Sequence, residues 1–255
     1  MMCKMLKRCF ILFVILLGSV GCKSLVIPND FVYKEIKTDT FVIASWQKIT
    51  DYNGKFKVYI EGDGASFDAY GRPTSNPTPK GKLLREIAFG DGNSNVIYLA
   101  RPCQFVTGGI CQQRHWTTAR FAQEVVSAEF EAVSEVVGDN EIVLVGFSGG
   151  AQVAGLISVA KKGLNVKKLI TIGGNLDHLA WTELHGVPNL SQSLNLADYR
   201  DEYLKIPQLH YVGVKDEVIP KELVYQFVRD KNKVVEVDAS HSYGWEEIYP
   251  LIWAE

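Results

Sequence analysis

The segment 146–150, which reads Gly-Phe-Ser-Gly-Gly, is the stretch of sequence whose residue types and spacing most directly suggest chemistry. It fits the pattern G-x-S-x-G, in which a serine occupies a tight strand-to-helix turn with its hydroxyl exposed. A Cβ at either outer glycine would collide with the neighbouring strand or helix. Residues 141–145 have the pattern of a buried strand and residues 151–162 that of an apolar helix. We therefore predict that Ser148 is a nucleophile, with a structural glycine turn as the alternative.

A serine hydroxyl is a weak nucleophile until a base takes its proton and a third group orients that base. Behind such a turn the partners follow in the order acid, then histidine. Asp216 comes directly after a strand-like segment and shortly before a helix opened by Pro220. We predict that Asp216 is the acid, with Glu217 and Asp177 as fallbacks. A helix cap is the structural alternative for Asp216.

The histidines differ in their positions relative to the expected strands. Of the five in the chain, His241 alone follows the last strand-like segment, residues 234–237, where the general base is expected. His210 lies inside a strand pattern and is expected to be packed. His178 and His185 flank a short helix and are expected to make structural hydrogen bonds. We predict that His241 is the base.

Acyl transfer also needs backbone N–H groups that point at the negative charge developing on the substrate oxygen. The amide of Gly149, directly after the serine, is one candidate donor. The other should come from the loop after the third strand, residues 61–64, which read Glu-Gly-Asp-Gly. By register this donor is Asp63, with Gly64 as the alternative. No metal or organic cofactor is expected for this chemistry.

These residues and their surroundings resemble the α/β-hydrolase superfamily, and within it a group of exported bacterial α/β-hydrolase lipoproteins. The similarity covers roughly residues 59–253 and implies a hydrolase, but it brings no substrate with it. Hydrolases of this fold often carry His-Gly in the oxyanion loop, whereas this chain has Glu61 in place of the histidine. Besides the serine turn and the 61–64 loop, the resemblance is carried by residues 98–104 (Tyr-Leu-Ala-Arg-Pro-Cys-Gln), 115–121 (His-Trp-Thr-Thr-Ala-Arg-Phe) and 174–178 (Gly-Asn-Leu-Asp-His).

The elements that must position these residues alternate between strands and helices. An antiparallel hairpin is expected first, and strands separated by helix-length segments then predict a mostly parallel sheet of eight strands flanked by helices. The expected strands are 31–37, 40–48, 55–60, 96–100, 141–145, 168–172, 209–214 and 234–237. The expected helices are 80–88, 117–137, 151–162, 179–184, 220–229 and 244–253.

Together these features predict a serine hydrolase that cleaves an ester through an acyl-enzyme. Only about thirty residues separate Gly174 from Gln208, where the cap domains of lipase-type enzymes are usually inserted. We therefore expect a small or absent cap and a small-molecule or extended acyl substrate. A serine peptidase or amidase with the same residues is one alternative. A non-catalytic envelope lipoprotein that uses the fold as a binding scaffold is another.

The N-terminal segment predicts export. Three cations among the first eight residues precede an apolar run, residues 9–17, and small residues follow. We expect residues 1–21 to be a signal peptide, with an uncleaved membrane anchor as the alternative. Cys22 follows glycine as in the lipobox of bacterial lipoproteins, which it resembles despite a serine at the usual leucine position. The expected organisation is a lipidated Cys22, a tether over residues 22–30 and one hydrolase domain over residues 31–255.

The charge balance argues against a nucleic-acid partner. The full chain has 27 Lys and Arg against 29 Asp and Glu, a net charge of −2. Loss of the three cations in the signal peptide would change this to −2 − 3 = −5. Such a surface attracts neither nucleic acid nor anionic lipid. We expect a monomer in the bacterial cell envelope, held at the membrane by its lipid and exposed to the periplasm or the exterior.

Besides the lipidated Cys22, two cysteines remain in the expected mature chain. Cys103 and Cys111 are separated by seven residues that include a Gly-Gly pair, so the segment can fold back on itself. Exported proteins keep disulfides, and we predict one here that contributes about 2–3 kcal/mol. Metal binding with His115 as a third ligand is the alternative.

Overall fold

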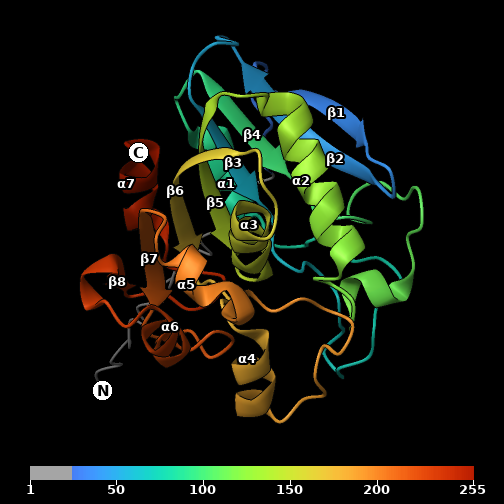
Figure 1. Ribbon diagram of the computed structural model, residues 1–255, viewed down its shortest axis with the longest axis vertical. Coiled ribbons are helices and arrows are strands. Elements are labelled where there is room, and N and C mark those ends of the chain that lie inside the picture. The colour runs from blue at the N-terminus through green and yellow to red at the C-terminus, as the bar shows by residue number, and fades with distance from the viewer. Residues whose placement is uncertain (1–24) are drawn as a thin grey trace, which may run out of the picture.

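The computed structural model describes residues 25–255, which build one sheet with helices on both faces (Figure 1). The sheet has eight strands in the order β1-β2-β4-β3-β5-β6-β7-β8. β2 pairs antiparallel with β1 and β4, and the pairings from β4 to β8 are parallel. The predicted fold class is confirmed. The strands are β1 Val32–Lys37, β2 Val42–Ile49, β3 Phe56–Ile60, β4 Asn95–Leu99, β5 Glu141–Phe147, β6 Asn165–Ile172, β7 Gln208–Gly213 and β8 Val234–Val237.

The helices divide into two layers because successive strand side chains point to opposite faces of the sheet. On one face, Ile142 and Leu144 of β5 belong to the core that includes residues of α2, α3, α5 and α6. On the other face, Val143 and Val145 of β5 pack with residues of α1 and α7. The helices are α1 Leu83–Gly90, α2 Gln123–Val137, α3 Gly149–Val159, α4 His178–His185, α5 Arg200–Tyr203, α6 Lys221–Val228 and α7 Tyr249–Trp253.

The start of α2 differs from the sequence prediction. The expected helix begins at residue 117, but a short 3₁₀ helix, η1 (Gln113–Trp116), comes first and α2 begins at Gln123. Between them Thr117 has φ −120° and ψ −104°, and Ala122 has φ −61° and ψ 160°. These angles break the helix and leave the intervening residues free to turn their side chains towards the carboxyl ends of the strands.

No cap domain lies between β6 and β7. This connection contains only α4, the 3₁₀ helix η2 (Leu196–Tyr199) and α5, the last two of which the sequence did not predict. The expectation of a small or absent cap is confirmed. The carboxyl ends of the parallel strands are therefore bordered by loops and by the ends of short helices, with no inserted domain over them.

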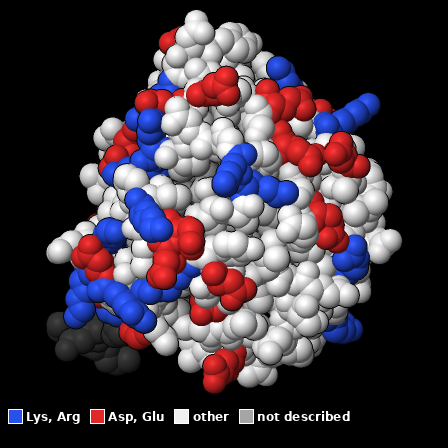
Figure 2. All heavy atoms as spheres, in the orientation of Figure 1, with Lys and Arg blue, Asp and Glu red and all other residues white. Residues whose placement is uncertain are grey.

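The predicted signal peptide, residues 1–21, and Cys22 lie outside the described residues. Within residues 25–255, no helix has the length and apolar character needed to cross a membrane. Cationic and anionic side chains are interspersed on the face shown in Figure 2. This pattern agrees with the nearly balanced composition of the chain.

Candidate active site

Ser148 occupies a strained turn between β5 and α3. Its backbone has φ 53° and ψ −123°, a conformation that non-glycine residues rarely adopt and that costs about 1–3 kcal/mol. A Cβ on Gly146 would lie 2.5 Å from the Cα of Ala151, and one on Gly150 would lie 2.2 Å from the carbonyl oxygen of Ile60. Both glycines are thus required sterically, as the sequence pattern predicted. The turn presents the hydroxyl of Ser148 at the carboxyl end of the sheet.

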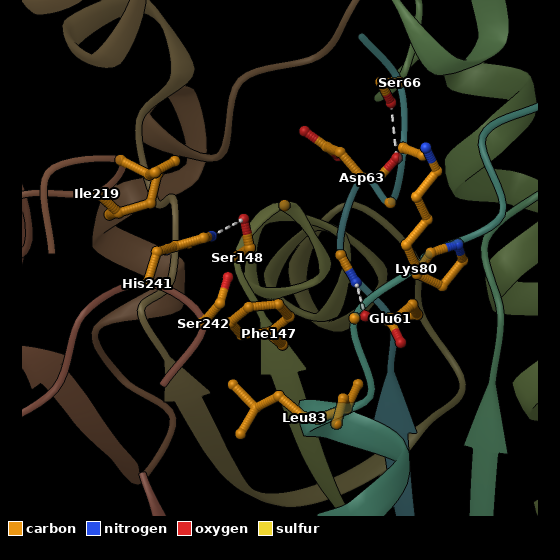
Figure 3. Close-up of a pocket in the computed structure, with 18 of the residues that line it drawn as sticks. Glu61, Asp63, Ser66, Lys80, Leu83, Phe147, Ser148, Ile219, His241 and Ser242 are labelled. Atoms are coloured by element: carbon orange, nitrogen blue, oxygen red, sulfur yellow. Dashed lines mark hydrogen bonds between the residues drawn. The ribbon is translucent and has the colours of Figure 1, made fainter. Parts of the chain in front are cut away.

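The structure brings Ser148, His241 and Asp216 together from three separate loops, and Figure 3 shows the contact between Ser148 and His241. His241 Nε2 lies 3.0 Å from Ser148 Oγ, and His241 Nδ1 lies 2.8 Å from Asp216 Oδ2. A carboxylate accepts a hydrogen bond from Nδ1–H, which leaves Nε2 as the acceptor for the serine hydroxyl. The imidazole is therefore held in the tautomer that a general base for Ser148 requires.

Asp216 holds its own loop as well as the histidine. Its Oδ1 accepts hydrogen bonds from the N–H groups of Val218 at 2.9 Å and Ile219 at 2.8 Å. The side chain is thus fixed by the backbone while the other oxygen faces His241. These bonds close the loop before α6 and do not cap the helix, whose N-cap residue is Pro220, so the helix cap considered for Asp216 is not formed.

The two alternative acids lie in other settings. Glu217 is exposed on the loop before α6. Asp177 caps the N-terminus of α4, where it accepts from the N–H groups of Leu179 and Ala180. Neither carboxylate is hydrogen-bonded to His241, whose carboxylate partner among the described residues is Asp216.

The other histidines divide between confirmed and wrong expectations. His210 is packed, as predicted: it is fully buried, bonds to Thr171 Oγ1 at 2.8 Å, and burial lowers its pKa to about 3. His185 makes the expected structural bond, to the carbonyl of Val218 at 3.0 Å. His178 was expected to do the same, but its ring nitrogens have no hydrogen-bond partner among residues 25–255. It is held instead by stacking on Phe121, with ring centroids 5.9 Å apart.

The two predicted oxyanion donors lie side by side. A Cβ on Gly149 would be only 2.1 Å from Asp63 Oδ1, so the loop after β3 touches the start of α3. Gly149 is the first residue of α3, and amides of the first helical turn have no acceptor within the helix. Within residues 25–255, the amides of Asp63 and Gly64 have no recorded acceptor either. The amides of Asp63 and Gly64 are therefore both available to a substrate oxygen.

Two arginines that the sequence analysis left without a role hold the Asp63 side chain. Arg120 Nη1 lies 2.7 Å from Asp63 Oδ2, and Arg101 Nη1 lies 3.6 Å from Asp63 Oδ1. Arg101 Nε is also 3.3 Å from the buried Glu129 of α2. Burial raises the pKa of Glu129 to about 8. The sequence does contain a signal for this buried ion pair, because Glu129 occupies one of the apolar positions of an otherwise amphipathic helix.

Glu61 is a further buried carboxylate next to the loop. Its Oε2 accepts a hydrogen bond from the Tyr98 hydroxyl at 2.6 Å, and its Oε1 accepts one from the Gly62 amide at 2.8 Å. Burial raises the pKa of Glu61. The residue that replaces the usual histidine therefore supports the backbone of the loop.

Ser148 opens onto a cleft of about 1050 Å³. In Figure 3, Glu61, Asp63 and Lys80 lie on one side of the serine and His241 and Ile219 on the other. Apolar side chains contribute a large part of the lining, and they come from several loops and from helices α1 and α4. They include Phe67, Leu83, Trp181, Leu190, Val218 and Ile219.

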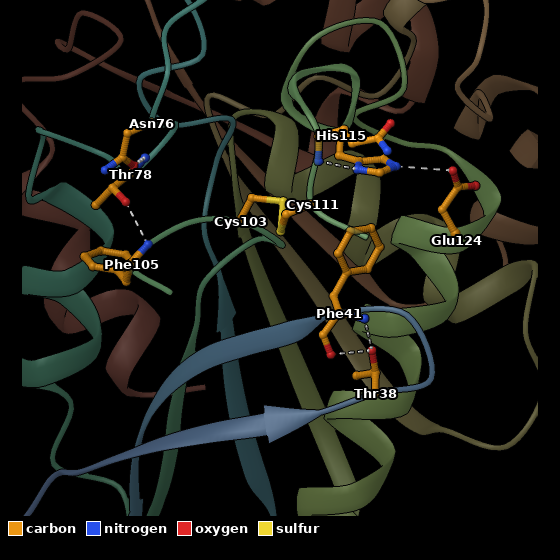
Figure 4. Close-up of a disulfide and its surroundings, with 10 residues drawn as sticks. Thr38, Phe41, Asn76, Thr78, Cys103, Phe105, Cys111, His115 and Glu124 are labelled. Atoms are coloured by element: carbon orange, nitrogen blue, oxygen red, sulfur yellow. Dashed lines mark hydrogen bonds and ion pairs between the residues drawn. A yellow bond between two sulfur atoms is a disulfide. The ribbon is translucent and has the colours of Figure 1, made fainter. Parts of the chain in front are cut away.

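Cys103 and Cys111 lie at bonding distance, with sulfurs 2.18 Å apart and Cα atoms 5.7 Å apart (Figure 4). His115, the third ligand of the alternative metal site, instead accepts the N–H of Gln112 through Nδ1 at 3.1 Å. Its Nε2 faces Glu124 at 3.5 Å. Within residues 25–255, no cluster of three metal-ligating side chains occurs.

The sheet order and the serine turn define the class of the α/β hydrolases. The sequence model of the family described as serine hydrolase (FSH1) matches residues 107–243, which is more than half of the chain. The protein therefore belongs to this serine hydrolase family and is a hydrolase. None of the curated proteins is significantly similar to it in sequence.

Solved structures of similar fold include other α/β hydrolases. One is an α/β serine hydrolase without a lid from Xanthomonas campestris, at 15% identity and a TM-score of 0.53, covering 91% of this chain and 94% of that one. Another is Est1E from Butyrivibrio proteoclasticus, at 16% identity and a TM-score of 0.61, covering 87% and 94%. A third is an α/β serine hydrolase homologue from Coxiella burnetii, at 17% identity and a TM-score of 0.52, covering 91% and 97%. At these identities the likeness establishes the fold.

Proposed function

We propose that the protein is a carboxylesterase that works through an acyl-enzyme. Ser148 Oγ attacks the ester carbonyl carbon while His241 takes its proton, and the amides of Gly149 and Asp63 bind the resulting oxyanion. His241 then gives the proton to the departing alcohol as the carbon–oxygen bond breaks. Water, deprotonated by the same imidazole, releases the acid and restores the serine. Asp216 stabilises the imidazolium formed in each half-reaction.

The hydrogen-bonded chain from Ser148 through His241 to Asp216 carries this proposal. A scaffold that only binds has no need of a serine held in a strained conformation against an oriented imidazole. The strain at Ser148 is maintained by close packing on both sides of the turn. Such strain persists where the surrounding structure holds it, and it is concentrated at functional sites.

The shape of the cleft supports a substrate that reaches beyond a short acyl group. About 1050 Å³ is more than a small ester fills, and no cap domain closes the cleft. Phe67, Leu83, Trp181 and Ile219 all line the cleft and offer apolar surface to an ester. We therefore favour extended esters over deeply enclosed acyl chains.

Labelling with a fluorophosphonate probe tests the reaction. The wild-type protein should be labelled and Ser148→Ala should not, because the probe phosphonylates an activated serine. An unlabelled wild type would exclude the enzymatic role and leave the binding scaffold. Hydrolysis of p-nitrophenyl acetate and butyrate should exceed that of aminoacyl p-nitroanilides. Faster cleavage of the anilides would assign the site to a peptidase or amidase.

We further propose that the enzyme is a monomeric lipoprotein of the bacterial cell envelope, anchored through Cys22 and without a nucleic-acid partner. The sulfurs of Cys103 and Cys111 lie at the distance of a disulfide bond, which supports a location in an oxidising compartment. Cys22→Ser should move the protein from the membrane fraction to the soluble fraction. A variant that still sediments with membranes would point to an uncleaved N-terminal helix instead.

A further inference from the structure

The peptide unit that joins Gly62 to Asp63 is held by a side chain without a role in the reaction proposed above. The Gly62 carbonyl accepts a hydrogen bond from Gln104 Nε2 at 2.9 Å. This carbonyl and the Asp63 N–H belong to the same planar peptide, and in a trans peptide they point in opposite directions. The described residues contain no cis peptide bond. The Gln104 amide therefore fixes the direction of the Asp63 N–H.

The Asp63 N–H is placed to act on a substrate bound at Ser148. A Cβ on Gly62 would lie 3.1 Å from the Phe147 carbonyl oxygen and 3.2 Å from the Ser148 Cβ, so this peptide packs directly against the nucleophile. Gly62, Asp63, Ser148 and Gly149 all line the cleft. Among residues 25–255 the Asp63 amide has no recorded acceptor, which leaves it available for a substrate oxygen.

Gln104 is fixed in one orientation. The residue is 1% exposed, and its Oε1 accepts the N–H of Arg101 at 3.1 Å while Nε2 donates to Gly62. Exchanging the two atoms would set oxygen against oxygen at Gly62. The amide lies so close to the loop that a Cβ on Gly64 would be 2.7 Å from Nε2. Gly64 also has φ +65°, so glycine at this position gives both the turn and the space for Gln104.

The backbone on both sides of Gln104 is strained and held by its neighbours (Figure 4). Cys103 has φ 70° and Phe105 has φ 61°, left-handed values that residues with a Cβ rarely adopt. Such conformations persist only where the surroundings impose them. Cys103 is joined to Cys111, and the Phe105 N–H donates to Thr78 Oγ1 at 2.7 Å.

We propose that Gln104 is a positioning residue that aims the Asp63 amide at the developing oxyanion. We propose also that the Cys103–Cys111 disulfide acts on the reaction through Gln104. The inference rests on the esterase function proposed above. It assigns the loop after β4 to the reaction, although none of the loop's residues lines the cleft.

Gln104→Glu is the most selective test. A glutamate can still accept the Arg101 N–H, but it presents an acceptor where the Gly62 carbonyl needs a donor. We expect kcat to fall about 10- to 100-fold, less than the ~100- to 1,000-fold that loss of a whole donor costs. KM for p-nitrophenyl butyrate should stay within about twofold, because an oxyanion donor acts on the transition state rather than on the bound ester. Gln104→Met, which removes the donor without adding a charge, should show the same split even if the glutamate variant fails to fold.

Binding of phenylboronic acid separates positioning from a general structural defect. Boronates form a tetrahedral adduct with an active serine, so their inhibition constant should rise by about the factor by which kcat falls. Gln113→Glu is the matched control, since Gln113 is an exposed neighbour and the charge change is the same. This control should keep the wild-type kcat and inhibition constant. A glutamate variant with wild-type values for both would overturn the role of Gln104.

The disulfide is tested by combining substitutions. Cys103→Ser with Cys111→Ser should lower kcat in the wild-type background but add little to Gln104→Glu, because both act on one peptide. Equal factors in the two backgrounds would show that the disulfide acts independently of Gln104. Wild-type esterase activity and fluorophosphonate labelling are measured alongside. Their absence would refute the proposed function itself, whereas an active wild type with unaffected Gln104 variants would refute only this inference.

Discussion

Asp216 and His241 are joined by a hydrogen bond of 2.8 Å between Oδ2 and Nδ1, and the second oxygen of the same carboxylate accepts two backbone N–H groups. The acid is therefore fixed to its loop by one oxygen and to the imidazole by the other. An asparagine at this position can present an NH₂ group to Nδ1, which favours the wrong tautomer of the histidine.

Asp216→Asn should accordingly lower kcat by about 10⁴-fold while leaving KM nearly unchanged. Steady-state hydrolysis of p-nitrophenyl butyrate measures the effect. Glu217→Gln is the control, because it removes the exposed neighbouring carboxylate and should retain full activity. Full activity in Asp216→Asn would show that another group orients His241.

Gly150→Ala should destabilise the fold severely. The added Cβ would lie 2.2 Å from the Ile60 carbonyl oxygen and 2.6 Å from that of Glu61, both of them backbone atoms that cannot move aside. We expect the free energy of unfolding in urea to drop by about 3 kcal/mol or more. Gly92→Ala adds the same methyl group where no atom lies within 4 Å, and its unfolding should match the wild type. Similar stability of the two variants would contradict the contact at β3.

Tyr98→Phe should also cost stability, because it leaves a buried acceptor of Glu61 without its 2.6 Å hydrogen bond. We expect a loss of about 2 kcal/mol in the free energy of unfolding. Tyr33→Phe removes a hydroxyl that bonds to the exposed Glu35 at 3.0 Å, and it should change stability by less than about 0.5 kcal/mol. Equal losses of unfolding free energy in the two variants would show that the buried hydrogen bond between Tyr98 and Glu61 contributes no more than an exposed one.

His210 should make the protein sensitive to acid. Burial lowers its pKa from 6.5 to about 3. Between these two pH values His210 is protonated in the unfolded chain but neutral in the folded protein. Stability from this group is therefore present above pH 6.5 and is lost as the pH falls towards 3.

Between pH 7 and pH 4.5 this one histidine should remove about 2 kcal/mol from the free energy of unfolding. The measurement is urea unfolding of the wild type and of His210→Gln at both pH values. The variant should be less stable at pH 7 but should lose less on acidification. Parallel losses in the two proteins would show that His210 titrates normally.

The sequence predicted the parts of the site that depend on chain order. The strand before Ser148, the acid after β7 and the histidine after β8 each follow a recognisable strand, and parallel strands end at one edge of the sheet. Their positions could therefore be expected without any side-chain coordinates. The eight strands were predicted for the same reason, since each is a short apolar run bounded by polar turns.

The contacts that support the loop after β3 could not be predicted in this way. Gln104 reaches Gly62 and Arg120 reaches Asp63 across 42 and 57 residues of chain, and no periodicity encodes such a pairing. The predicted start of α2 was wrong because the apolar residues at helical spacing extend back to Phe121. The chain turns at residues 117–122, and the helix begins only at Gln123. The polar ring of His178 suggested a hydrogen bond, but in the fold it stacks on the aromatic ring of Phe121.

The uncovered end of the sheet has a kinetic consequence. Because no inserted domain closes over Ser148, substrate and product can exchange with solvent without any rearrangement of the chain. Turnover then has no lid-opening step for a lipid–water interface to accelerate. Hydrolysis should rise smoothly with ester concentration, with no jump where the ester begins to form micelles, and the enzyme would act on molecules that reach it one at a time.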